Sequence, residues 1–258
     1  MLRESAYSSF WDLAHLPNFC ITIEYDGKDF AGWQLQPNAR TVQGELESAL
    51  QTLNSGELVR IHGAGRTDAG VHASGQVASF TLHQQWDVEE LRRAINGNTS
   101  KDVHVHSCHL ESDDFHARFT AKRRKYVYRC RIDETILDRN FVWRLGWSPQ
   151  IETLQSCADI IKGDHDFTTF SKWSSEVKNR RCIVYQSEWI NDGDFVIYTI
   201  EANRFLQHLI RYLVGTMMEV ARGKITVEDF VNLLEACDPK AKIAKAPPQG
   251  LCLEEITY

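Results

Sequence analysis

Apolar and polar positions alternate along the first half of the chain in two rhythms. Residues 19–25 alternate with a period of two, which is typical of a half-buried β-strand. Residues 42–53 repeat apolar positions every three or four residues, as an amphipathic helix does. The same patterns predict strands over 58–62, 76–82 and 103–110 and a helix over 88–95. This order of elements is that of a β-α-β-β-α-β unit.

The second half predicts another set of strands and helices. Residues 191–194 read Asn-Asp-Gly-Asp, a strong hairpin turn between two alternating segments. The predicted elements are strands over 125–132, 182–190, 195–202 and 251–257 and helices over 151–162, 205–221 and 227–235. We therefore expect an extension over 1–17, an α+β half over 18–110 and a second α+β half over 111–258.

The helix predicted over 205–221 carries one charged residue whose environment the pattern leaves open. At about 100° per residue, its leucines, isoleucine, methionine and valine form one broad apolar stripe. Arg211 and Gly215 lie on the opposite flank. Arg211 is then either solvated or directed at a partner, beside a glycine small enough to admit another segment.

Composition indicates a globular chain with a sizeable core. Hydrophobic residues make up 43% of the 258 positions, and no apolar run approaches the roughly 18 to 20 residues of a membrane span. Residues 1–17 lack the apolar core and cleavage site of a secretory signal. The seven cysteines are scattered and never spaced Cys-x-x-Cys, which argues against disulfides and a zinc site. We expect a cytoplasmic protein that does not contact the membrane.

Basic residues are concentrated in a single segment of an otherwise acidic chain. The formal net charge is −6, yet positions 118–131 hold seven basic residues and no acid, leaving about −13 on the rest. We call this segment the basic strip; its members are Arg118, Lys122, Arg123, Arg124, Lys125, Arg129 and Arg131. It favours local binding of phosphates, as in nucleic acids, or is a solvated basic face.

The run GAGRTDAGVHASGQVASF over 63–80 places one carboxylate, Asp68, among glycines that permit a tight loop. Arg66 stands where a phosphate-binding P-loop needs lysine before its hydroxyl residue, so the run is a poor P-loop. Two interpretations remain. Asp68 is either a functional acid held against a ligand or a turn residue that bonds its own backbone.

Several motifs in register resemble the tRNA pseudouridine synthase A (TruA) family over nearly the whole chain. The resemblance is carried by Tyr25-Asp26-Gly27 with Phe30, Gly32, Trp33 and Gln34, by GRTDAGVHASGQV over 65–77, KRRKYVY over 122–128, HDFTTF over 165–170, NRFLQHLIRYLVG over 203–215 and APPQGL over 246–251. This series favours the functional interpretation of the loop.

The resemblance assigns roles to individual residues. Asp68 matches the family's essential aspartate and nucleophile, and Arg211 matches the basic residue that pairs with it. Tyr126 matches the aromatic residue that packs on the target base, and Leu251 matches the apolar residue that closes the pocket. Arg66 matches an arginine near the displaced nucleotide.

Further contacts with tRNA are expected from the basic strip, at Arg118, Lys122, Arg123, Arg124 and Lys125, and from Arg204. Arg204 departs from the small residue expected in many relatives, and an extra cation there would contact phosphate or change which uridines are modified.

The resemblance also implies a fold, a substrate and a partner. The fold would be two ferredoxin-like (RRM-like) α+β halves that share a mainly antiparallel central sheet, with helices packed on it and an active-site cleft between the halves. The reaction would convert uridine to pseudouridine at positions 38, 39 and 40 of the tRNA anticodon arm, in a homodimer without cofactor or metal. The alternatives are a catalytically silent RNA-binding module on the same fold and a synthase acting on other tRNA uridines.

Histidines offer weaker hypotheses. His104 and His106 share a strand face with His109 nearby, but no acid or cysteine accompanies them at ligand spacing, which argues against a metal site. His72, next to the Gly-rich loop, is either a proton shuttle or a structural hydrogen-bonding group.

Overall fold

The computed structural model describes residues 16–174 and 177–258, so most of the expected extension over 1–17 lies outside the described residues. Within those ranges, ten strands form one sheet in the order β4-β1-β3-β10-β5-β9-β8-β7, with β2 paired to β3 and β6 paired to β5. The strands are β1 Asn18–Tyr25, β2 His62–Gly63, β3 His72–Thr81, β4 Val103–Glu111, β5 Arg123–Arg131, β6 Trp143–Arg144, β7 Gly163–Asp166, β8 Arg181–Asp192, β9 Phe195–Ala202 and β10 Leu251–Thr257.

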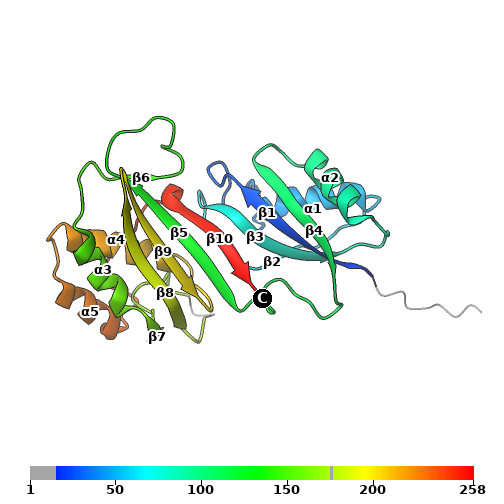
Figure 1. Ribbon diagram of the computed structural model, residues 1–258. Helices are drawn as coiled ribbons and strands as arrows, with labels where there is room; N and C mark the ends of the chain where they lie inside the picture. Colours follow the sequence, from blue (N-terminus) through cyan, green and yellow to red (C-terminus); the bar gives the residue numbers. More distant parts are fainter. Residues whose placement is uncertain (1–15, 175–176) are drawn as a thin grey trace, which may run out of the picture.

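Helices gather beside the strands of each half (Figure 1). They are α1 Val42–Leu53, α2 Val88–Asn98, α3 Ile151–Ile160, α4 Leu209–Ala221 and α5 Val227–Ala236, with a 3₁₀ turn at Pro248–Gly250. Helix α2 packs on β4 and contacts α1, whereas α3 packs on β8 and contacts α4 and α5. The chain is thus a mixed α+β protein, as the sequence predicts.

Strand β10 joins the two parts of the sheet (Figure 1). Leu253 pairs with Ala73 of β3 in a parallel ladder and with Tyr126 of β5 in an antiparallel ladder. Among the described strands, β10 with β3 and β5 with β6 are the parallel pairs, so the sheet is mainly antiparallel. The last strand of the sequence therefore lies between β3 and β5.

Side-chain caps set where three of the helices begin. The hydroxyl of Thr41 accepts from the Gly44 amide at the start of α1. Asp87 accepts from two amides at the start of α2, and Thr226 forms a capping box with Asp229 at the start of α5. Caps of this kind contribute about 1 kcal/mol each, which explains why these predicted helix starts match the structure.

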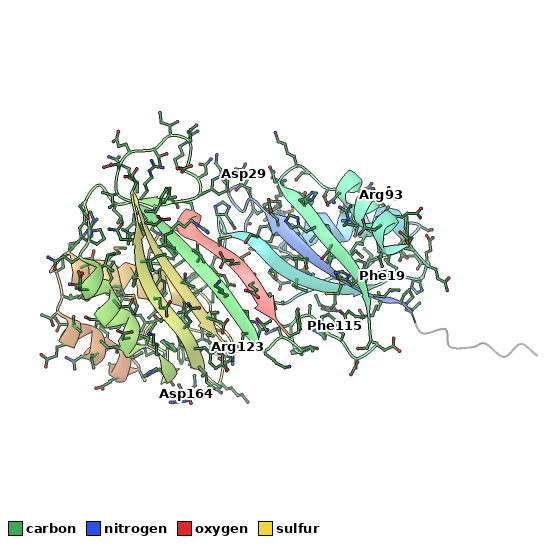
Figure 2. The ribbon with its side chains drawn as sticks, viewed as in Figure 1. Phe19, Asp29, Arg93, Phe115, Arg123 and Asp164 are labelled. Atoms are coloured by element: carbon green, nitrogen blue, oxygen red, sulfur yellow. The ribbon has the colours of Figure 1, made fainter. Side chains whose placement is uncertain are left out.

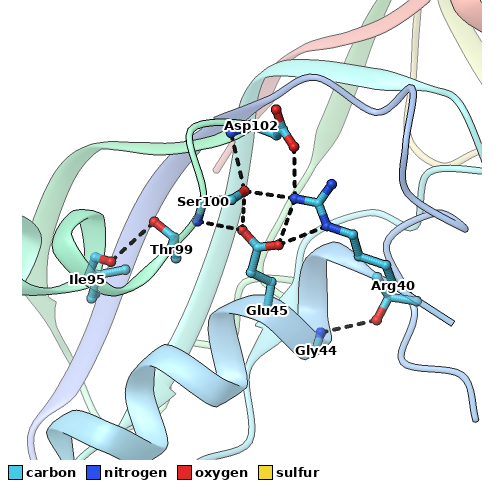
Figure 3. Close-up of polar contacts among 8 residues, drawn as sticks. Arg40, Gly44, Glu45, Ile95, Thr99, Ser100 and Asp102 are labelled. Atoms are coloured by element: carbon cyan, nitrogen blue, oxygen red, sulfur yellow. Dashed lines mark hydrogen bonds and ion pairs between the residues drawn. The ribbon is translucent and has the colours of Figure 1, made fainter. Parts of the chain in front are cut away.

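A polar network fixes the start of α1 against the loop before β4 (Figure 3). The Glu45 carboxylate accepts from the Ser100 amide at 2.8 Å and from its hydroxyl at 2.6 Å. The Arg40 guanidinium bridges Glu45 at 3.0 Å and Asp102 at 2.8 Å. These contacts hold the end of the 26–41 loop, and that loop packs against the Gly-rich segment.

Several predicted elements differ from the structure, and the strand expected over 76–82 begins four residues earlier, at His72. The strand expected over 58–62 is reduced to His62–Gly63, because only these residues pair with β3, opposite Ser79 and Ala78. The helix expected over 205–221 begins at Leu209, because His208 adopts a left-handed backbone with φ of 68°. The short strands β6 and β7 were not predicted.

Candidate active site

The backbone of the Gly-rich loop over 64–70 is held in place by hydrogen bonds from a side chain and from the backbone of neighbouring segments. The Gln76 side chain donates to the Gly65 carbonyl at 2.8 Å and accepts from its amide at 3.4 Å. The Trp33 amide donates to the Thr67 carbonyl at 3.1 Å. Gly32, at φ of 102°, packs so closely that a Cβ there would lie 2.7 Å from that carbonyl. The loop is therefore fixed by residues that precede and follow it.

Asp68 and Arg211 meet across the two halves of the chain. Asp68 Oδ2 lies 3.4 Å from Arg211 Nη1, and their side chains are 17% and 10% exposed. Arg211 Nε also donates to the Ala246 carbonyl at 2.8 Å. A Cβ on Gly215 would lie 2.5 Å from the Ala244 carbonyl, so the glycine admits this segment beside α4. Arg211 is thus directed at a partner and not solvated.

His208 is a third member of the site that the sequence analysis did not single out. Its Nε2 lies 3.7 Å from Asp68 Oδ2. Its Nδ1 is buried and has no hydrogen-bond partner among the described residues. Burial lowers the pKa of His208, and Lys245, Arg211 and Lys172 lower it further, while Asp68 opposes them. The only sequence signal was its position three residues before Arg211 on the same flank.

Apolar and aromatic side chains line the loop on the side of β5 and β10. Tyr126 is 5% exposed and packs edge-on against Phe205, with ring centroids 5.2 Å apart. A Cβ on Gly65 would lie 3.6 Å from the Tyr126 hydroxyl. Burial raises the pKa of Tyr126, and the nearby Tyr25 and Asp68 raise it further.

The other two residues that the resemblance assigned to this site flank the loop. Leu251 is buried at the first position of β10, directly after the 3₁₀ turn. A Cβ on Gly70 would lie 2.9 Å from Pro248 of that turn, so the turn packs against the loop. Arg66 is exposed on the loop itself.

The structure corrects the expectation that Arg124 contacts RNA. Its side chain turns inward, and its guanidinium donates to four carbonyls of the protein, those of Ala64, Arg118, Ala121 and Asn203, at 2.8 to 3.1 Å. The pKa of Arg124 is lowered by burial. Side chains alternate across a strand, so Arg124 faces the interior between two residues that face outward.

The rest of the basic strip is more accessible but partly paired. Arg123 contacts Glu201 at 2.8 Å, and Lys125 contacts Glu254 at 2.8 Å. Exposed positions from the expected RNA-binding set are Arg118, Lys122, Arg123 and Arg204.

The histidine hypotheses are resolved in part. His72 Nδ1 accepts from the Gly27 amide at 3.0 Å, and Nε2 lies 2.9 Å from the Asn140 carbonyl, which supports a structural role. The ring centroids of His104 and His106 lie 5.0 Å apart, and His106 contacts Glu24. Residues 16–174 and 177–258 contain no group of three potential metal ligands.

No helix in these ranges has the length and apolar character needed to cross a membrane.

Two hollows lie away from Asp68. One of about 290 Å³ is bounded by the start of β1, the end of β3 and residues 113–116, and one of about 420 Å³ lies between β7 and α5. Neither includes Asp68, so the site is identified by its paired charges and by its place in the fold, and not by volume.

The family model and the related sequences that match this chain agree on one family. The family model described as tRNA pseudouridine synthase matches residues 21–120 and 158–258. A tRNA pseudouridine synthase A of Streptococcus pneumoniae is 38% identical over 249 residues, covering 94% of this chain and 99% of its own. The corresponding proteins of Afipia carboxidovorans and a Geobacillus species are 37% and 35% identical, covering 94% and 92% of this chain and 100% and 96% of their own.

The matched segments include the Asp68 loop and the helix that carries Arg211, which defines an RNA-modifying isomerase of the pseudouridine synthase class. The chain belongs to the tRNA pseudouridine synthase A (TruA) family. A solved Cbf5-Nop10-Gar1 complex is similar at a TM-score of 0.34 and 11% identity, over 89% of this chain and 56% of that chain. That similarity is too low to carry an argument.

Proposed function

We propose that this protein converts uridine to pseudouridine at positions 38, 39 and 40 of the tRNA anticodon arm, with Asp68 as the nucleophile. The contact of Asp68 with Arg211 at 3.4 Å carries the proposal. A carboxylate oxygen can act as a nucleophile that forms a covalent intermediate, and Arg211 directs an opposite charge at this one.

The reaction needs no redox partner, because it is an isomerisation. The bond from N1 of the base to C1′ of the ribose breaks, the uracil turns, and C5 joins C1′. The hydrogen leaves C5 and N1 gains one, so atoms balance without a cofactor. Asp68 serves this exchange by attack either on the sugar or on the base ring, and both routes need the carboxylate that Arg211 faces.

We assign the remaining roles to the residues around the loop. Tyr126 stacks on the extruded base, where stacking offsets on the order of 1 to 3 kcal/mol of the cost of leaving the helix. Leu251 closes the pocket beside the Tyr126 wall, and Arg66, exposed on the loop, lies near the displaced nucleotide. Arg118, Lys122, Arg123, Lys125 and Arg204 bind phosphates of the tRNA.

Organisation beyond the single chain follows from the family resemblance. We propose that the protein is a homodimer that binds its tRNA in the cytoplasm. We also propose that each chain consists of two ferredoxin-like halves divided at residue 110, with the active-site cleft between them. Sedimentation tests the homodimer, and limited proteolysis tests the division of the chain into two halves.

The deciding experiment compares the wild type with Asp68→Asn and Asp29→Asn. Asp29 is an exposed residue of the same half, and its substitution provides a matched control (Figure 2). Each protein is incubated with unmodified tRNA, and pseudouridine is counted by position. We expect product from the wild type and Asp29→Asn and none from Asp68→Asn, with tRNA binding retained. Product from Asp68→Asn at the wild-type level would support the alternative that Asp68 is only a turn residue.

A further inference from the structure

Three tilted aromatic rings and one guanidinium lie one beside the next at the surface, and of these four residues only Arg118 belongs to the RNA-binding set described above. The rings of His62 and His116 lie 4.8 Å apart at 34°, and those of His116 and Phe119 lie 4.4 Å apart at 40°. The Arg118 guanidinium lies 5.6 Å from the Phe119 centroid. We call His62, His116, Phe119 and Arg118 the aromatic column. Phe119 is 76% exposed, so much of its ring surface is open to a ligand.

The segment that carries the column is ordered by its own hydrogen bonds. The Ala117 amide donates to the Ser79 hydroxyl at 3.1 Å, and the Tyr258 hydroxyl donates to the Ala117 carbonyl at 2.9 Å. The amide of His116 donates to the Thr120 hydroxyl at 3.1 Å, and the Thr120 amide donates to the His116 carbonyl at 3.0 Å. The exposed ring is thus presented by a prearranged turn, which reduces the entropy lost when a ligand binds.

The aromatic column is close to the Asp68 loop. His62 belongs to β2, which leads directly into that loop. One nitrogen of Arg124, Nη2, donates to both the Ala64 carbonyl of the loop and the Arg118 carbonyl of the column. In Figure 2 the column segment runs between the labelled residues Phe115 and Arg123.

The chemistry of the column suits a nucleobase. Burial lowers the pKa of His116, and His62 and Arg118 lower it further, so the ring is neutral at pH 7 and presents a π face. Arg118 and the exposed Lys122 add positive charge beside these rings. Aromatic faces next to cations are the combination that binds unpaired nucleotides, because every base has a π face and every nucleotide a phosphate.

We propose that the aromatic column is a stacking site for a second, unpaired base of the substrate RNA, in the loop beside the target uridine. Phe119 stacks on this base and Arg118 contacts its phosphate. The inference rests on the proposed function in one respect, that the substrate is an RNA with a loop. It adds a contact that fixes where the RNA lies before any base reaches Asp68.

The test combines protein variants with abasic sites in a fluorescein-labelled anticodon hairpin. Phe119→Leu keeps an apolar side chain but removes the ring face. Phe195→Leu is the matched control, because Phe195 also lies under an arginine, Arg131 at 5.0 Å, but at the opposite end of β5. Binding is measured by anisotropy for each protein with each hairpin, and circular dichroism checks that all variants fold.

We expect one loop position at which base removal weakens binding to the wild type about tenfold, the effect of roughly 1.4 kcal/mol of stacking. At that position the same base removal should have little effect on Phe119→Leu, while Phe195→Leu behaves as the wild type. Coupling of this kind between Phe119 and one base supports the proposal.

Absence of coupling at every loop position would overturn it, even if all proteins make pseudouridine. Coupling without any pseudouridine from the wild type would overturn the proposed function and leave the stacking site in place.

Discussion

The Arg211 guanidinium divides its hydrogen bonds between the Asp68 loop and the segment that follows α5. Its Nη1 faces Asp68 at 3.4 Å, while its Nε is held by the Ala246 carbonyl at 2.8 Å. Residues 143 positions apart are thereby joined through one rigid side chain. The second bond fixes the direction from which Arg211 meets the carboxylate.

Removing this guanidinium should impair chemistry more than binding. For Arg211→Met we expect turnover on tRNA to fall about 100-fold, the scale seen when one stabilising donor is removed from an active site. Single-turnover assays at saturating tRNA measure the effect, and anisotropy measures binding. Arg222→Met is the control, because Arg222 follows the same helix but stacks on Trp147. Equal turnover of the two variants would contradict the assigned role of Arg211.

Gly215 should be intolerant of a methyl group. A Cβ there would lie 2.5 Å from the Ala244 carbonyl, so Gly215→Ala must push the segment around Ala244 away from α4. This shift would also disturb the hydrogen bond from Arg211 to the Ala246 carbonyl. We expect a loss of about 1 to 3 kcal/mol in unfolding free energy and a fall in activity. Gly97→Ala in α2 meets nothing within 4 Å and should gain about 0.5 to 1 kcal/mol. Urea unfolding of both variants checks the opposite signs.

Arg124 should matter for stability where its neighbour Arg123 does not. Arg124→Met leaves buried carbonyls without a donor, each costing about 1 to 3 kcal/mol, so we expect a loss of several kcal/mol. Arg123→Gln removes an exposed ion pair with Glu201 and should change the stability little, because water screens such pairs. Thermal unfolding compares them, and a smaller loss for Arg124→Met would contradict the structural role.

His208 should trade stability for function. Its left-handed backbone is tolerated better by asparagine, and its buried Nδ1 has no partner among the described residues. We therefore expect His208→Asn to raise the unfolding free energy by about 1 kcal/mol and to lower turnover, because the imidazole facing Asp68 is lost. The measurements are urea unfolding and single-turnover kinetics. Destabilisation by the asparagine would show that the conformation is not strained.

His72 should make the fold sensitive to acid. Burial lowers its pKa from the usual 6.5, against the raising effect of Asp26, so the folded protein keeps the neutral ring. The unfolded chain then binds more protons, and unfolding free energy should fall as the pH drops below 6.5. His72→Gln should show a smaller fall between pH 7.5 and 5.5 in urea midpoints. An unchanged pH dependence in this variant would assign the effect to other groups.

The periodicity of apolar residues predicted most of the helices and strands, but it did not predict which strands pair with one another. The helix over 42–53 and the strand over 251–257 match exactly, because each has a clear period and a capping or turn residue at its start. The prediction of a strand over 58–62 was largely wrong, because a strand needs a pairing partner and β3 pairs only with His62 and Gly63 of this segment. Residue patterns do not contain that information.

The pairing of Asp68 with Arg211 was predicted from the family resemblance, whereas the other contacts of the candidate site were not. Asp68 and Arg211 emerged from motifs, and the structure brings them together. Arg124 was placed in the basic strip by charge alone, although the alternation of β5 turns it inward. His208 was missed because the apolar pattern predicts a helix through this position, whereas its backbone is left-handed and α4 begins only after it.

Strand β10 has a consequence for how the protein is made. Because β10 lies between β3 and β5, a chain that is still being synthesised presents two open sheet edges until β10 has been made. Premature termination before Leu251 would leave those edges unprotected and prone to aggregate. Synthesis of β10 is thus a condition for assembling the sheet, and a product that lacks this strand should be removed by proteolysis instead of surviving as a weakened enzyme.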